Sequence, residues 1–228
     1  FRSHYILKPQ NAAFPEMPEN EHLTMKLAEL LKIQTVVSSL IRLKSGELSY
    51  ITKRIDRTTK GEKIHMLDMF QITEAFDKYR SSMEKVGKAV IEHSSNTLLD
   101  VLRLYEVVIF TYITGNNDMH LKNFSLILKD ENWGFAPAYD LLNVQLHLQE
   151  DKEETALTIG GKKSRLTKYD FIILGEKFGL SERQIENVFQ RFIKAEKKML
   201  LLIDQSFLSE ANKINYKDLL MQRINLFK

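Results

Sequence analysis

The pattern of apolar and polar residues divides this chain into two parts, and the first part contains three β-rich runs, at residues 3–8, 35–43 and 47–55. Between the first and second runs, leucines recur at helical spacing up to Lys32, and Asn20 stands where a helix N-cap is expected. Lys44, Ser45 and Gly46 separate the second and third runs and predict a three-residue hairpin loop.

The second part is mainly helical. The pattern becomes helical from Ile64 onward, and Asn96 begins a helix that is apolar on several faces and that Gly115 ends. A short hairpin with strands at 124–129 and 133–136 then interrupts the helices. Two capping-box spacings predict later helix starts, Thr167 with Asp170 and Ser181 with Gln184.

This order predicts an α+β fold. The small β-containing part covers residues 1–57, and the larger helical part, with the hairpin embedded in it, covers residues 58–228. The polar stretch 56–63 between them is a candidate hinge.

Composition narrows the class of protein. The 228 residues include 9 glycines and 4 prolines, so long uninterrupted elements are expected. Because there is no cysteine, a disulfide framework and a thiolate zinc site are excluded, and a reducing compartment, the cytoplasm, is expected. No apolar run reaches the roughly 18 residues of a membrane helix. A net charge of +3 is too small to argue for nucleic-acid binding.

The densest polar loop, residues 116–123, lies between the apolar helix and the hairpin. Since a hairpin brings its two ends together, Asp118 and Asn123 before it are expected near Asp140 after it. Protein kinases place a catalytic Asp five residues before a magnesium-binding Asn, which is the spacing of Asp118 and Asn123. The pattern therefore indicates phosphoryl transfer.

A cation for the phosphates is available in the first part of the chain. Lys8 ends the first β-rich run and Glu21 lies at the start of the first helix. A strand lysine paired with a helix glutamate is the other half of a kinase active site, so we expect these two side chains to pair.

Two longer motifs carry a resemblance to a known family. Gly-Asn-Asn-Asp-Met-His-Leu-Lys-Asn-Phe-Ser at 115–125 and Ala-Pro-Ala-Tyr-Asp-Leu-Leu at 136–142 resemble the signature of the HipA-like serine/threonine kinases, the toxins of bacterial toxin–antitoxin modules. The segments 4–9 and 53–57 are similar to that family's ATP-lysine strand and adenine-side strand. The resemblance implies a kinase-like two-lobed fold, with ATP and Mg²⁺ as cofactors.

By position, the resemblance also implies roles for individual residues. Asp118 would be the catalytic base and Lys122 would stabilise charge on the transferring phosphate. The remaining residues would bind the cofactors. Asn123 and Asp140 would hold the magnesium, and Lys8 with its partner Glu21 would contact the phosphates. Lys53, Arg54 and Ile55 would frame the adenine, and His120 and Tyr139 would line the rest of the nucleotide site.

The chain departs from the family in two respects. Lys53 stands where the family often has Glu, and Ile55 where it often has Phe. Only seven residues precede Lys8, so the family's glycine-containing phosphate loop is expected outside this sequence, on the same chain or on a separate N-terminal subunit.

The resemblance implies a protein substrate, such as an aminoacyl-tRNA synthetase, and a helix-turn-helix antitoxin that links the chain to operator DNA. A non-catalytic module that binds the antitoxin and DNA remains an alternative. The basic loop Lys162–Arg165 is either a contact for DNA phosphates or an ordinary solvent-exposed turn. A kinase acting on a small molecule is the other alternative, because the core motif reports phosphoryl transfer rather than the acceptor.

Overall fold

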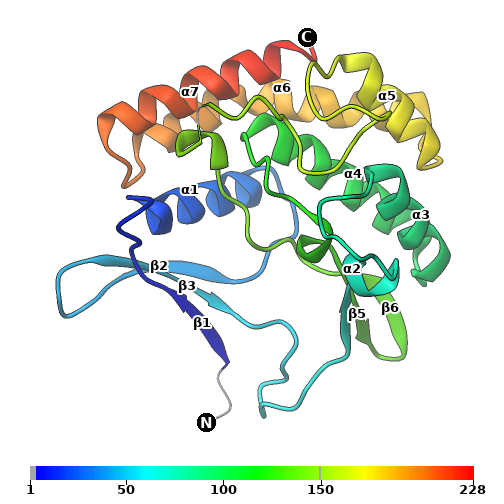
Figure 1. Ribbon diagram of the computed structural model, residues 1–228, viewed down its shortest axis with the longest axis horizontal. Coiled ribbons are helices and arrows are strands. Elements are labelled where there is room, and N and C mark those ends of the chain that lie inside the picture. The colour runs from blue at the N-terminus through cyan, green and yellow to red at the C-terminus, as the bar shows by residue number, and fades with distance from the viewer. Residues whose placement is uncertain (1–3, 149) are drawn as a thin grey trace.

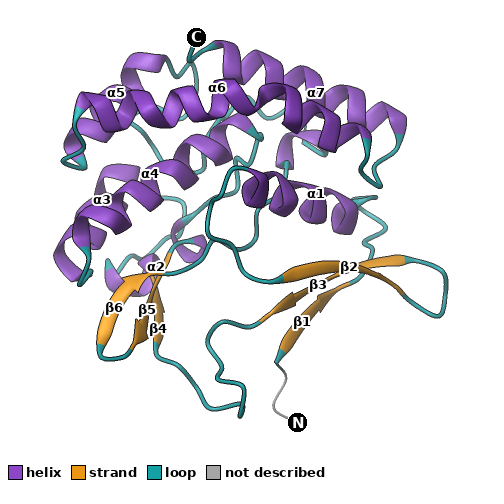
Figure 2. Ribbon diagram, turned by 180° about the vertical axis from the view of Figure 1, so that it is seen from behind, coloured by secondary structure: helices purple, strands orange, loops and turns teal. Residues whose placement is uncertain are grey.

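The computed structural model describes residues 4–148 and 150–228. Two antiparallel sheets lie at one end of the molecule, and the helices α5 (Lys168–Lys177), α6 (Glu182–Asp204) and α7 (Glu210–Asn225) lie at the other (Figures 1 and 2). Helices α1 (Met17–Leu30), α3 (Met83–His93) and α4 (Thr97–Ile113) lie between them. The predicted α+β class is confirmed, whereas the division at residue 57 stays a prediction.

The first sheet has the strand order β1-β3-β2 and packs against α1. Its strands are β1 (Tyr5–Lys8), β2 (Ser38–Arg42) and β3 (Leu48–Lys53), and β1 pairs antiparallel with β3 from Tyr5↔Lys53 to Lys8↔Tyr50. The Leu43 N–H donates to the Glu47 carbonyl at 2.8 Å, which leaves the predicted three-residue loop 44–46. Ser3, the expected first residue of β1, lies outside the described residues.

The predicted cap of α1 is wrong. The helix begins at Met17, with Pro18 in its first turn, and Asn20 is already inside the helix and fully buried. The Asn20 side chain donates to the Asn143 carbonyl and accepts the Asn143 N–H, both at 2.8 Å. An asparagine amide can cap a helix or link two buried segments by hydrogen bonds, and the sequence pattern does not distinguish these two roles.

Helix α4 runs through the core, as its apolar residues predict. Val108, Ile109 and Phe110 have no exposed surface. Gly115 follows with φ of +70°, and a Cβ there would lie 2.4 Å from Leu219 Cδ2, so both backbone and packing favour glycine at this helix end.

The second sheet has the strand order β4-β5-β6 and contains the predicted hairpin. Its strands are β4 (Met66–Asp68), β5 (Ser125–Lys129) and β6 (Asn132–Phe135). The prediction that the chain is helical from Ile64 onward is therefore wrong at β4. This strand has only three residues and pairs with β5, distant in the sequence, so local periodicity carries no signal for it.

Shorter elements complete the fold. Helix α2 (Met69–Ile72) follows β4 directly, and the single-turn 3₁₀ helices are η1 (Leu121–Asn123) and η2 (Val144–Leu146). Thr167 and Ser181 form the two predicted capping boxes, which confirms the starts of α5 and α6. Among the described residues, no helix is both long and apolar enough to cross a bilayer.

Candidate active site

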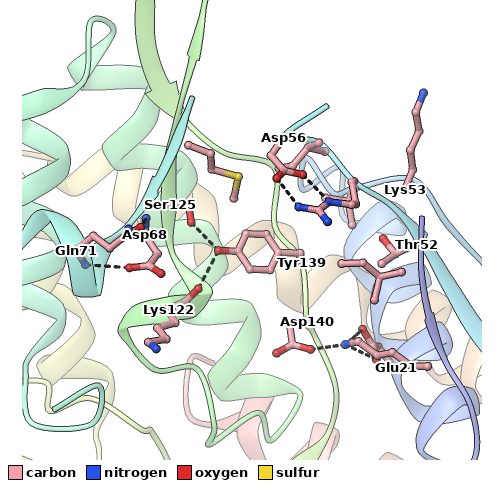
Figure 3. A pocket seen from close by; sticks show the side chains of 16 residues that line it. Glu21, Thr52, Lys53, Asp56, Asp68, Gln71, Lys122, Ser125, Tyr139 and Asp140 are labelled. Carbon is pink, nitrogen blue, oxygen red and sulfur yellow. Dashed lines mark hydrogen bonds and ion pairs between the residues drawn. The ribbon is translucent and has the colours of Figure 1, made fainter. Parts of the chain in front are cut away.

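A cavity of about 420 Å³ lies between the two sheets (Figure 3). One wall comes from β1, the end of β3 and the residues after it; the other comes from β4, α2, β5 and the segment that follows β6. Eight of the eleven predicted site residues line it: Lys8, Glu21, Lys53, Arg54, Ile55, Lys122, Tyr139 and Asp140.

The Lys8 ammonium joins both walls of this cavity. Its Nζ donates to both Glu21 carboxylate oxygens at 2.8 and 2.9 Å and to Asp140 Oδ1 at 2.5 Å. Figure 3 shows Glu21 and Asp140 on opposite sides of this contact. The expected Lys8–Glu21 pair is confirmed, and Asp140 adds a second carboxylate to it.

Burial and the charge of the ion-pair partner shift the pKa of Lys8 in opposite directions, and the same is true of Glu21. Burial lowers the pKa of Lys8, but the charges of Glu21 and Asp140, with the hydrogen bonds to them, outweigh it, so the pKa of Lys8 is raised. Burial raises the pKa of Glu21 to about 7, while Lys8 opposes that rise and Asp140 adds to it. Lys8 is therefore charged at neutral pH, and Glu21 titrates there.

The backbone at Asp140 is held in an unusual conformation. Asp140 has φ of +59°, in the left-handed region that most residues avoid. Asn116 Nδ2 donates to the Asp140 carbonyl at 3.4 Å and ties the segment to the polar loop. Strained conformations of this kind recur at functional sites, where they fix the direction of a side chain.

The segment that follows β3 is fixed by an ion-pair cluster. Asp56 accepts hydrogen bonds from Arg54 at 2.9 and 2.7 Å and from Arg57 at 2.6 Å. The bonds from Arg54 hold the pKa of Asp56 below its usual value. The Lys53 side chain extends away from Glu21 and Asp140 in Figure 3, so it offers the cavity its stem and backbone more than its charge.

Tyr139 connects the hairpin to the polar loop. Its hydroxyl lies 2.6 Å from Ser125 Oγ and donates to the Lys122 carbonyl at 2.9 Å, and burial raises its pKa (Figure 3). The Lys122 ammonium lies 4.8 Å from the centre of the Phe70 ring. Lys122 is thus held at the cavity edge by its backbone and by a cation–π contact.

Asp118, His120 and Asn123 do not line this cavity. Asn123 Nδ2 donates to the Asp118 carbonyl at 3.1 Å, which closes the loop on itself. His120 is buried and its Nε2 accepts from Lys78 Nζ at 3.0 Å, and burial lowers its pKa, so the ring is neutral at pH 7. His120 is therefore held by Lys78, outside the lining of this cavity, and its part in a nucleotide site stays a prediction.

The Asp118 carboxylate is held by a tyrosine that the sequence pattern did not indicate. The Tyr79 hydroxyl donates to Asp118 Oδ1 at 2.8 Å, and the Tyr79 ring packs edge-on against His120 with centroids 5.1 Å apart. Burial, aided by the bond to Asp118, raises the pKa of Tyr79 to about 12, so its hydroxyl keeps its proton. Tyr79 precedes the loop by some forty residues, and no local spacing links the two.

Asp68 and Gln71 also line the cavity, and sequence reasoning missed both. Asp68 caps α2: its Oδ1 accepts the Gln71 N–H at 2.9 Å, and Gln71 Oε1 accepts the Asp68 N–H. The Asp-x-x-Gln spacing was the available signal for this helix start.

Asp140 and Asn123 carry carboxylate and amide oxygens, the kinds of atom that magnesium prefers as ligands. Asp140 and Asn123 flank the hairpin, and the hydrogen bond that Asn123 donates leaves its carbonyl oxygen available. No cluster of three or more His, Cys, Asp or Glu residues is found in 4–148 and 150–228. Magnesium needs no such cluster, because one or two protein oxygens with phosphates and water complete its octahedron.

Comparison with known families gives one match that spans most of the chain. Residues 1–199 match the sequence model described as "HipA-like C-terminal domain". A Haemophilus influenzae protein named "Putative kinase" is 27% identical over 92% of this chain and 70% of its own. The Sinorhizobium fredii protein "Putative kinase Y4dM" is 29% identical over 86% of this chain and 53% of its own.

Two solved structures share the fold at low sequence identity. HipA of the Shewanella oneidensis toxin–antitoxin system, solved with HipB and operator DNA, has a TM-score of 0.83 at 19% identity over 98% of this chain and 58% of its own. The Helicobacter pylori proinflammatory kinase CtkA has a TM-score of 0.68 at 16% identity over 98% of this chain and 88% of its own. The α+β fold is therefore kinase-like, as expected, and the chain spans little more than half of HipA.

Proposed function

The chain belongs to the family of HipA-like C-terminal domains, and we propose that it acts as an ATP- and magnesium-dependent protein kinase that phosphorylates serine or threonine. The observation that carries the proposal is the position of Lys8, which bridges Glu21 and Asp140 in the cavity between the sheets. In kinases a strand lysine and a metal-binding aspartate meet at the ATP phosphates.

We assign the nucleotide to this cavity. Lys8 would hold the phosphates, and Lys53 to Ile55 would frame the adenine through backbone groups and side-chain stems. Asn123 and Asp140 would hold magnesium, which when bound would neutralise charge on the phosphates. Tyr139 would set the floor beside Asp140, and His120 would support the loop from behind.

Asp118 would receive the acceptor proton. The acceptor oxygen forms a bond to the γ-phosphorus as the bond from that phosphorus to the bridging oxygen breaks, and ADP leaves with the electron pair. The proton of the acceptor hydroxyl passes to the Asp118 carboxylate. Lys122, at the cavity edge, would stabilise charge on the transferring group.

We extend the proposal to the partners, the lobes and the substrate of the kinase. The Shewanella HipA structure contains HipB and operator DNA, so we propose a helix-turn-helix antitoxin as partner and a contact with operator DNA through it. Residues 1–57 would form part of the small lobe and residues 58–228 the large lobe. An aminoacyl-tRNA synthetase in the cytoplasm is the first substrate to test.

The test is transfer of labelled γ-phosphate from ATP. The purified protein is incubated with labelled ATP, Mg²⁺ and cell lysate, beside an Asp118→Asn variant of equal folded content. We expect labelled protein bands with the wild type and none with the variant. Label only in small molecules would contradict a protein kinase, and equal labelling by the variant would contradict the base assignment.

A further inference from the structure

A second cavity, of about 410 Å³, opens beside Asp118 on the side that the first cavity does not reach. Asp118 lines this cavity and is absent from the lining of the first. If ATP occupies the first cavity, the Asp118 carboxylate therefore faces a separate space. The hydroxyl group that accepts the phosphate needs a space of this kind to reach Asp118.

Tyr79 marks where an acceptor hydroxyl would lie. It lines the second cavity, and its hydroxyl donates to Asp118 Oδ1 at 2.8 Å. This is the contact that an acceptor hydroxyl must make before its proton is transferred. An O–H group approaching from this cavity thus reaches the base in hydrogen-bonding geometry.

The charge of the second cavity differs from that of the first. Four lysine or arginine side chains line the first cavity together with four carboxylates. The described residues that line the second include Asp118, Asp151 and Glu153 but no lysine or arginine. Burial lowers the pKa of His147, which also lines it, so this ring adds no positive charge at neutral pH.

Besides Asp118, the cavity has two carboxylates, and Asp151 is the more available of these to a ligand. Glu153 already pairs with Lys163 at 3.2 Å, whereas among the described residues Asp151 accepts hydrogen bonds from neutral groups alone, Asn117 Nδ2 at 2.9 Å and the Glu153 N–H at 2.9 Å. Asn117 also lines the cavity, is 8% exposed, and its Oδ1 has no hydrogen-bond partner among the described residues. A buried acceptor atom without a partner is costly unless a ligand or water supplies the donor.

The remaining wall of this cavity is apolar. Phe14 and Leu148 are partly exposed there, at 38% and 44%, and lie beside Met17, Leu142 and Val144. Such a surface would take an apolar side chain rather than a sugar or another polar metabolite.

We propose that the second cavity is the acceptor site, and that it selects a polypeptide segment in which the serine or threonine is flanked by a lysine or arginine and an apolar residue. This inference rests on the proposed kinase function. The hydroxyl takes the place of the Tyr79 hydroxyl on Asp118, the basic side chain pairs with Asp151, and the apolar side chain lies on Phe14 and Leu148.

The experiment compares short synthetic peptides, each with one central serine, that differ only in having Arg, Ala or Glu beside it. With the purified protein, ATP and Mg²⁺, we expect kcat/KM to fall from Arg to Ala to Glu. Asp151→Asn, which keeps the shape of the side chain, should reduce the Arg-over-Ala preference about fivefold, the effect of one partly exposed ion pair. Glu131→Gln, an exposed acid in the hairpin turn, is the matched control and should change nothing.

The outcomes separate the two proposals. Phosphorylation of all three peptides at equal rates, or an Arg preference that survives Asp151→Asn, overturns the acceptor assignment and leaves the kinase function standing. Transfer to small polyols such as glycerol but to no peptide also overturns it. Absence of transfer to any acceptor, together with no binding of a fluorescent ATP analogue, overturns the kinase function and this inference with it.

Discussion

Lys8 and Asp140, 132 residues apart in the sequence, are joined by an ion pair with 2.5 Å between Nζ and Oδ1. Glu21 holds the same ammonium group from α1. One cation therefore connects the first sheet, the first helix and the segment after the hairpin, so its removal should affect both nucleotide binding and folding.

We expect Lys8→Ala to weaken ATP binding and to lower the free energy of unfolding by about 1–3 kcal/mol, because Glu21 is left buried without its partner. Binding of a fluorescent ATP analogue and urea unfolding measure the two effects. Lys44→Ala, at the exposed tip of the β2–β3 hairpin, is the control and should match the wild type. Unchanged ATP affinity in Lys8→Ala would contradict the phosphate role.

The raised pKa of Glu21 predicts how stability depends on pH. The folded value is about 7 against an ordinary value of 4.5, so the folded protein binds this proton more tightly than the unfolded chain does. The stabilisation from Glu21 is therefore complete below about pH 4.5 and is lost as the pH rises through 7.

Thermal unfolding between pH 4.5 and 7.5 tests this dependence by comparison with Glu21→Gln. The comparison is needed because His22, His120 and His147 have lowered pKa values, and their contribution changes in the opposite direction. The midpoint of the wild type should fall relative to that of Glu21→Gln as the pH rises. Parallel curves would show that Glu21 does not titrate in this range.

Asp140→Asn should remove most of the magnesium dependence of ATP binding, because a neutral amide is a weaker ligand for a hard cation. Titration of the ATP analogue with and without EDTA measures this dependence. The wild type should lose affinity in EDTA, whereas the variant should respond little. Asp68→Asn, in the same cavity but on the other side of the hairpin, is the matched comparison and should keep the EDTA response.

Asn20→Ala should lower the free energy of unfolding by about 2–4 kcal/mol, because it breaks both hydrogen bonds to Asn143 in a fully buried place. Urea unfolding provides the measurement. Asn187→Ala, exposed on α6, is the control and should be neutral or slightly stabilising, since alanine favours helix. A loss below 1 kcal/mol in Asn20→Ala would show that water replaces the bridge.

The sequence predicted features that depend on local spacing. The capping boxes at Thr167 and Ser181, the hairpin after residue 123 and the pairing of Lys8 with Glu21 are all found in the structure. The catalytic, cofactor and metal roles of the site residues stay predictions, and only labelled-phosphate and binding experiments test them.

Features that depend on distant contacts were not predictable in this way. Strand β4 exists because β5 supplies its partner, and Asn20 is a bridge because Asn143 lies beside it. Tyr79 meets Asp118 only through the packing of the segment before α3 against the polar loop. A single sequence gives no measure of such pairings, since neither residue type nor spacing specifies the partner.

The exposure of β1 has a consequence for how often the site is complete. The strand is four residues long and pairs antiparallel with β3, and Ile6 and Leu7 are 46% and 49% exposed. A short, exposed strand opens at a lower free energy than the core, so amide hydrogens of β1 should exchange with solvent well before those of α4. Each opening would carry the Lys8 ammonium away from Asp140, and the apparent nucleotide affinity would be scaled by the fraction of molecules in which the strand is closed.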